Sequence, residues 1–84
     1  MTEDQNCVYV LRSTIDPNRY YSGLTGDIEK RLATHNSGGS QHTRMLRPWQ
    51  LVVSMQFSTG ASAVAVEKYL KSGSGRAFAK KHFA

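Results

Sequence analysis

The chain has 84 residues, enough for one domain (residues 1–84) with a small hydrophobic core. Its single cysteine, Cys7, excludes an internal disulfide and a zinc site built on several cysteines. No apolar run approaches the about 20 residues of a membrane span, and the polar N-terminus is unlike a signal peptide, so we expect a soluble, cytoplasmic protein.

The formal net charge of +5 is unevenly distributed along the chain. Two basic and five acidic residues precede Lys30, whereas from Lys30 onward there are nine basic residues and a single acid, Glu67. Basic surfaces attract polyanions, so the asymmetry favours nucleic acid as a partner, with a general solubilising charge as the alternative. The side chains that we expect to contact nucleic acid are Lys30, His42, Arg44, Arg47, Lys71 and Arg76.

Two strands are predicted in the first part of the chain. After a loose end at residues 1–6, the β-branched and aromatic run 7–12 predicts a strand that carries Tyr9 on one face. A turn with Asp-Pro-Asn chemistry then leads to a second strand at 19–24, which carries Tyr21. On their own, the two tyrosines favour an interpretation as core residues at strand edges.

The first helix is predicted to begin after Asp27, a good N-cap residue, and to end near Asn36, where a glycine-rich segment follows. Its buried stripe, at i, i+3, i+4 and i+7, includes two polar residues, Arg31 and His35. Polar groups at positions where leucines normally pack indicate a pocket. The alternative is that Arg31 extends past the edge of the core and His35 binds a backbone carbonyl.

The second half of the chain predicts one more strand and two more helices. The strand covers residues 49–57, and its alternation predicts one core face. That face comprises Trp49, Leu51, Val53, Met55 and Phe57. A helix at 61–71 carries Glu67 on its apolar stripe, and after a break at 72–75 a short basic helix at 76–83 has Phe78 as its expected anchor. We therefore expect an α+β domain with a three-stranded antiparallel sheet flanked by helices.

Several short motifs occur in a recognisable order. The tripeptide Cys-Val-Tyr at 7–9 and the tripeptide Tyr-Ser-Gly at 21–23 lie on the two strands, and Arg31 lies on the helix that follows. Arg-Pro-Trp-Gln-Leu-Val begins the third strand, and Val-Glu-Lys-Tyr-Leu-Lys lies on the second helix. In this order and spacing, the chain resembles the GIY-YIG endonuclease superfamily over nearly its whole length.

The chain departs from the pattern of that family at two places. Cys7 stands where the first tripeptide of the family begins with glycine. Some members also carry an active-site asparagine beyond the glutamate, whereas no asparagine follows Asn36 here. The second departure concerns the phosphate pocket and leaves the carboxylate in place.

The resemblance implies a DNA endonuclease of repair or processing that depends on Mg²⁺ or Mn²⁺. By the resemblance, Glu67 would hold the metal and Arg31 would bind phosphate oxygens, a role suited to its forked donors. By the resemblance, Tyr9 or a water that it holds would help to activate the nucleophile with His35. Tyr21 would orient the phosphate or the water shell of the metal. The implied catalytic residues are Tyr9, Tyr21, Arg31, His35 and Glu67.

Other interpretations remain open from the residues alone. Glu67 could form a salt bridge with Arg31 or Lys71 instead of binding a metal. The domain could be a nucleic-acid-binding module of the same fold without catalysis. It could also be a subunit that acts by binding a partner protein or a second copy of itself, because so small a domain offers little surface for reading sequence.

Overall fold

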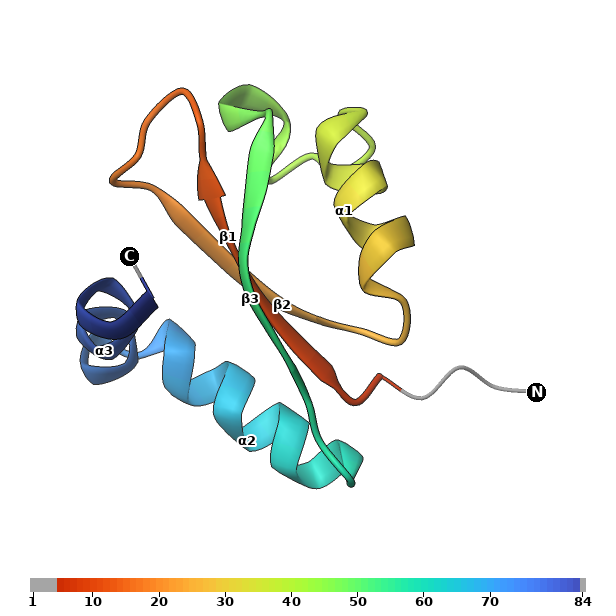
Figure 1. Ribbon diagram of the computed structural model, residues 1–84, viewed down its shortest axis with the longest axis vertical. Helices are drawn as coiled ribbons and strands as arrows, with labels where there is room; N and C mark the ends of the chain where they lie inside the picture. The colour runs from red at the N-terminus through yellow and green to blue at the C-terminus, as the bar shows by residue number, and fades with distance from the viewer. Residues whose placement is uncertain (1–4, 84) are drawn as a thin grey trace.

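The computed structural model describes residues 5–83. Its three strands are β1 (Cys7–Ser13), β2 (Tyr20–Thr25) and β3 (Trp49–Gln56), paired antiparallel in the order β2-β1-β3. Its helices are α1 (Ile28–Asn36), the 3₁₀ turn η1 (Arg44–Leu46), α2 (Gly60–Lys71) and α3 (Gly73–Phe83). Figure 1 shows α1 on one side of the sheet and α2 with α3 on the other side. The expected α+β fold is confirmed.

The central strand β1 supplies both halves of the core. Tyr9 and Leu11 pack with Trp49 on the face under α1. Val8 and Val10 pack on the opposite face, under α2 and α3. Because successive side chains alternate between the faces and helices cover both, the strand is apolar at nearly every position. The predicted faces of this strand are confirmed.

The single core face predicted for the third strand is wrong. The pairing of β3 with β1 skips Val52, so β3 has a bulge at that residue. A bulge adds one residue to one strand and exchanges the faces of the residues beyond it. Trp49 therefore packs under α1, whereas Met55 and Phe57 pack against the core under α2 and α3.

Helix α1 begins and ends where the sequence predicts. The Asp27 carboxylate accepts a hydrogen bond from the Lys30 backbone N–H at 3.1 Å, which satisfies one of the first amide groups of the helix. After the last residue, Asn36, the chain reverses through Gly38, whose φ of +84° is a left-handed value that glycine adopts readily. The Asn36 side chain donates to the Trp49 carbonyl at 3.0 Å and accepts from the Trp49 N–H, and so ties α1 to the start of β3.

Helix α3 begins earlier than predicted, at Gly73. The predicted break at residues 72–75 is one residue long, Ser72, in the structure. The Ser72 hydroxyl accepts a hydrogen bond from the Gly75 N–H at 3.1 Å. Gly75 is buried so closely against the Tyr69 carbonyl that a Cβ there would overlap it, which explains how α3 packs onto α2. The expected anchor Phe78 is instead 40% exposed.

Residues 1–4 of the expected loose end lie outside the described residues. Asn6 is not loose, because its carbonyl accepts from the Phe57 N–H at 2.9 Å. Within residues 5–83, none of the helices has the length and apolar character that crossing a membrane requires.

Candidate active site

Tyr9 lies at the centre of the site. It comes from the middle strand of the sheet, is fully buried, and has its hydroxyl over Gly23 of β2, the residue with which it pairs. A Cβ at Gly23 would lie 2.6 Å from the Tyr9 hydroxyl oxygen, closer than real Cβ atoms approach. Glycine at this position therefore provides the space in which the hydroxyl lies.

His35 holds the Tyr9 hydroxyl from the α1 side. Its Nε2 lies 2.9 Å from the Tyr9 oxygen, and its Nδ1 lies 2.7 Å from Thr43 Oγ1. Burial, and then the positive charge of Arg31, lower the pKa of His35 below its usual value. The imidazole is therefore neutral at pH 7, with one ring nitrogen donating and the other accepting. The alternative partner, a backbone carbonyl, is wrong, since both partners are hydroxyls.

Arg31 approaches the same hydroxyl from the solvent side. Its Nε donates to the Tyr9 oxygen at 3.5 Å, the long limit of a hydrogen bond, and its side chain is otherwise exposed. Burial raises the pKa of Tyr9 above its usual value, and the hydrogen bond from Arg31 opposes this shift. Tyr9 thus keeps its proton at neutral pH while the guanidinium remains charged and within reach of an incoming anion.

Tyr21 completes the cluster from the neighbouring strand. Its ring centroid lies 5.0 Å from that of His35 and 6.4 Å from those of Tyr9 and Trp49. These tilted contacts are typical of stable aromatic packing. Four of the five predicted catalytic side chains therefore lie together on the α1 face: Tyr9, Tyr21, Arg31 and His35.

Glu67 comes from the other layer of the molecule, on α2. Its side chain is 14% exposed, and Lys71 Nζ lies 3.0 Å from its Oε2 in an i,i+4 ion pair. Among the described residues, no hydrogen bond or ion pair joins Glu67 to the four residues on the α1 face. Burial is the main cause of the raised pKa of Tyr9, and the charge of Glu67 is a minor one. Of the two salt-bridge alternatives, the one with Lys71 is observed.

The surroundings of Glu67 suit a metal ligand. Its Oε2 is buried and makes no hydrogen bond of good geometry in the described part of the chain, and its charged partner there is Lys71 Nζ at 3.0 Å. A divalent cation could take the place of this half-exposed lysine at the buried oxygen. Residues 5–83 hold no group of three His, Cys, Asp or Glu side chains that could cage a metal. One carboxylate fits Mg²⁺, which keeps several waters and takes other ligands from phosphates.

The predicted nucleic-acid contacts in the loop after α1 are exposed. The Arg44 Nε donates to the Gly38 carbonyl at 3.1 Å, and the Arg47 Nη1 donates to the Arg44 carbonyl at 3.1 Å. These bonds order the loop and leave the guanidinium groups at the surface. His42 is exposed in the same loop.

The other predicted contacts line two cavities. Lys30 and Arg31 line a polar cavity of about 200 Å³ at the start of α1. Lys71 and Arg76 line a larger cavity, of about 460 Å³, between β2, α2 and α3. The predicted contacts therefore lie on both layers of helices, on α1 and the loop after it and on α2 and α3.

Thr43 belongs to the site although the sequence analysis did not select it. It is 1% exposed, its hydroxyl holds His35, and its carbonyl accepts from the Trp49 indole N–H at 2.8 Å. A threonine in a polar loop carries no sequence signal for this role. The partner is revealed only when the loop folds back onto α1.

Comparisons with known proteins show which family the chain is similar to. The profile of the GIY-YIG catalytic domain matches residues 5–81. The UPF0213 protein YazA of Bacillus subtilis is 42% identical over 72 residues, 84% of this chain and 71% of that protein. The UPF0213 protein YsiG of Lactococcus lactis is 38% identical over 69 residues, 81% of this chain and 64% of that protein. The UPF0213 protein SSP2268 of Staphylococcus saprophyticus is 35% identical over 69 residues, 81% of this chain and 82% of that protein.

The matched residues include both tyrosine-bearing strands, α1 with its arginine and histidine, and α2 with its glutamate. A GIY-YIG domain implies a nuclease-type function with DNA as the substrate. Since the profile spans almost every described residue, this chain belongs to the GIY-YIG family.

Proposed function

We propose that this domain is an endonuclease that hydrolyses phosphodiester bonds of DNA with Mg²⁺ or Mn²⁺, in DNA repair or processing. One observation carries the proposal: the buried Tyr9 hydroxyl lies 2.9 Å from a neutral imidazole and 3.5 Å from a guanidinium. Attack of water on a phosphodiester needs a group that takes a proton and a cation where negative charge develops. The cluster around Tyr9 contains both.

The proton path runs from Tyr9 to His35. Because burial raises the pKa of Tyr9, the phenol remains protonated and cannot act as a base by itself. It can accept a proton from the attacking water only as it passes its own proton to Nε2 of His35. The lowered pKa of His35 keeps that nitrogen unprotonated beforehand. This path requires the tautomer in which Nδ1–H donates to Thr43 Oγ1.

Arg31 has the role of binding the phosphate. Its bond to Tyr9 is long and its side chain is exposed, so turning the guanidinium toward a phosphate costs little. Movement of Arg31 would also uncover the Tyr9 hydroxyl, so that phosphate and water would reach it together. Donors of this kind contribute about 10²–10³-fold to the rate in other enzymes.

Glu67 would hold the metal through its buried oxygen. The competing ion pair with Lys71 is weak, because the lysine side chain is 53% exposed and i,i+4 pairs contribute only about 0.3–0.5 kcal/mol. When bound, the metal supplies positive charge to the phosphate and lowers the pKa of a coordinated water.

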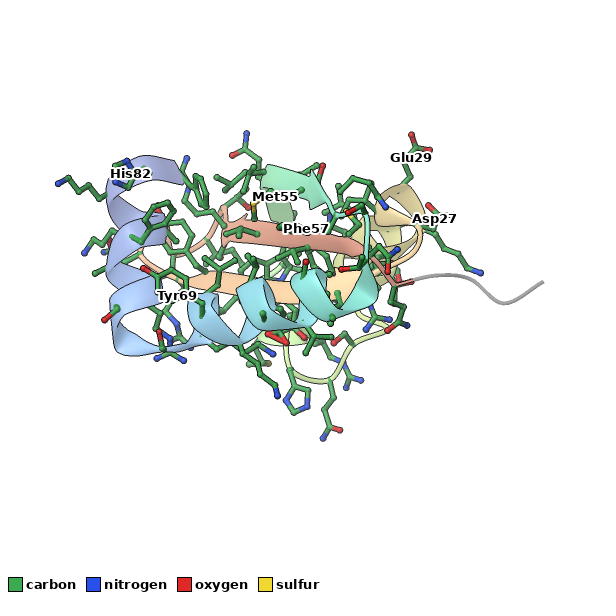
Figure 2. The ribbon with its side chains drawn as sticks, turned by 90° about the horizontal axis from the view of Figure 1, so that it is seen from below. Asp27, Glu29, Met55, Phe57, Tyr69 and His82 are labelled. Carbon is green, nitrogen blue, oxygen red and sulfur yellow. The ribbon has the colours of Figure 1, made fainter. Side chains whose placement is uncertain are left out.

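The test compares the parent protein with Glu67→Gln and with Glu29→Gln. Both variants lose one carboxylate without a change in size, but Glu29 projects from the first turn of α1 into solvent (Figure 2). Nicking is measured on labelled duplex, nicked, branched and single-stranded DNA, with Mg²⁺ and with a chelator. We expect the parent and Glu29→Gln to cut only with metal, and Glu67→Gln to bind DNA normally without cutting.

Three results would contradict the proposal. Cutting that survives Glu67→Gln unchanged would remove Glu67 as the metal ligand. DNA binding by a folded parent that cuts no substrate with either metal would favour a nucleic-acid-binding module. A folded parent that neither binds nor cuts DNA would instead favour a subunit that acts through a partner protein or a second copy.

A further inference from the structure

The cavity between β2, α2 and α3 has a distinctive chemistry. Its floor is apolar and is formed by the buried residues Val10, Leu70 and Ala79. Its rim is basic, and the four basic residues are Arg19, Lys71, Arg76 and Lys80. None of the residues that line it in the described part of the chain is acidic. The cavity therefore combines a strong preference for an anion with an apolar surface below it.

The cavity adjoins the candidate active site across the edge strand β2. Tyr21 borders the cavity, while its ring packs on the opposite, α1 face of the sheet, 5.0 Å, centroid to centroid, from His35. Lys71 also lines it and forms the ion pair with Glu67. A strand of nucleic acid whose phosphate lies between Arg31 and Glu67 would thus have its neighbouring nucleotide at the mouth of the cavity.

We propose that this cavity binds a nucleotide of the DNA strand that lies beside the scissile phosphate and is not stacked in a duplex. The proposal rests on the proposed function and specifies the form of its substrate. The phosphate would lie against the four basic residues, and the base would lie over the apolar floor beside Tyr20, which packs on the same face of the sheet. The nucleotide belongs either to an unpaired strand end or to an unpaired internal segment.

The size of the cavity favours a nucleotide over a phosphate alone. Its volume of about 460 Å³ lies within the roughly 300–1,000 Å³ of pockets that enclose small molecules. A phosphate bound only by surface lysines would need no buried floor. Bases stack on aromatic side chains without regard to sequence, and β2 is an edge strand whose outer backbone groups are not paired within the sheet. These features suit a nucleotide of any sequence.

The test measures DNA binding in the presence of chelator, so that no cutting occurs. The probes are a fluorescent hairpin with a blunt end, the same hairpin with a four-nucleotide single-stranded overhang, and the overhang probe with a terminal phosphate. The proteins are the parent, Arg76→Gln/Lys80→Gln, and the control Lys68→Gln/Lys81→Gln. The control loses the same charge from exposed positions that do not line the cavity. Glutamine preserves helix propensity, and thermal unfolding verifies that every variant is folded.

We expect the parent to bind the overhang probe about tenfold more tightly than the blunt probe, consistent with stacking of one base. The cavity variant should lose this preference, whereas the control variant should keep it and weaken binding to both probes alike. A further gain from the terminal phosphate identifies a strand end as the bound form, and equal binding identifies an internal nucleotide. Equal effects of the two double variants on both probes would overturn the proposal.

The same proteins separate this proposal from the proposed function. A parent that cuts DNA with Mg²⁺ but binds overhang and blunt probes equally would overturn the nucleotide site and leave the nuclease intact. A parent that does not cut, but whose preference for the overhang is lost in the cavity variant, would support the nucleotide site and remove the nuclease.

Discussion

The space under the Tyr9 hydroxyl makes Gly23 the residue whose substitution tests the site most directly. In Gly23→Ala, the new Cβ would lie 2.6 Å from the Tyr9 oxygen and 2.8 Å from its Cζ. Ordinary contacts begin near 3.4 Å, so the end of the ring must move by about 0.8 Å. His35 lies 2.9 Å away on the other side of the hydroxyl, so the movement disturbs the proton path.

The expected cost can be worked out from these contacts. Overpacking a filled core costs about 1–3 kcal/mol, and weakening the Tyr9–His35 hydrogen bond costs about 0.5–1.5 kcal/mol. Replacing glycine within a strand returns roughly 0.5–1 kcal/mol. We therefore expect the free energy of unfolding to fall by about 0.5–4 kcal/mol, with about 2 kcal/mol as the central value. Displacing a catalytic group by about 1 Å should lower the cleavage rate by about 10²-fold.

Two measurements check this expectation. Urea unfolding is followed by the fluorescence of the buried Trp49, and nicking is measured on the preferred substrate at saturating Mg²⁺. Gly73→Ala is the matched control, because a Cβ at Gly73 would meet no atom within 4 Å. It should be neutral or slightly stabilising at the start of α3. If Gly23→Ala has the same free energy of unfolding and the same nicking rate as the parent, the Tyr9 hydroxyl is not packed against Gly23, and the proposed proton path has no structural support.

Two further predictions concern the histidine. Thr43→Val removes the hydroxyl that holds Nδ1 and should cost about 1–3 kcal/mol by urea unfolding, along with most of the nicking activity, whereas Thr43→Ser keeps the oxygen and should keep both. Because the pKa of His35 is lowered on folding, the unfolded chain binds more protons between that pKa and about 6.5, so the free energy of unfolding should fall as the pH is lowered through this window. Urea midpoints measured at several pH values should show that His35→Gln loses this pH dependence. The control His42→Gln, in which an exposed histidine is replaced, should keep it. Equal pH dependence in the parent and both variants would contradict the prediction.

Local rules account for the parts of the fold that the sequence predicted correctly. Asp27 caps α1 because its short side chain accepts a hydrogen bond from a backbone amide of the first turn. This interaction is local and does not depend on how the helix packs in the fold. The faces of β1 follow from alternation alone, since its side chains must point in opposite directions. Arg31 and His35 were indicated by their polar character on a buried helical stripe, and the resemblance added Tyr9 and Tyr21. Their positions on one helical face and two paired strands explain why the four residues meet.

The missed features depend on contacts between distant segments. The bulge at Val52 allows Trp49 to pack under α1 while Met55 packs under α2. The alternation of apolar residues within the strand does not reveal that the two faces exchange at this residue. Thr43 contacts His35 only because the loop returns to the sheet, where Asn36 binds the backbone of β3. Both features depend on tertiary contacts, because β3 packs against helices on both faces of the sheet and the loop with Thr43 packs against α1.

The candidate site divides into a rigid part and an adaptable part, and the division follows its chemistry. The Tyr9–His35–Thr43 chain is fully buried and hydrogen-bonded, as a proton path needs if its distances are to be fixed before the substrate arrives. Arg31 is exposed, and among residues 5–83 the one ion-pair partner of Glu67 is a half-exposed lysine, so the two groups proposed to meet phosphate and metal can rearrange. Substitutions in the buried chain should therefore lower both stability and cleavage, whereas substitutions of the adaptable groups should lower cleavage alone. If the site were retained only for packing, substitutions of the exposed Arg31 or of Glu67 would change neither stability nor cleavage.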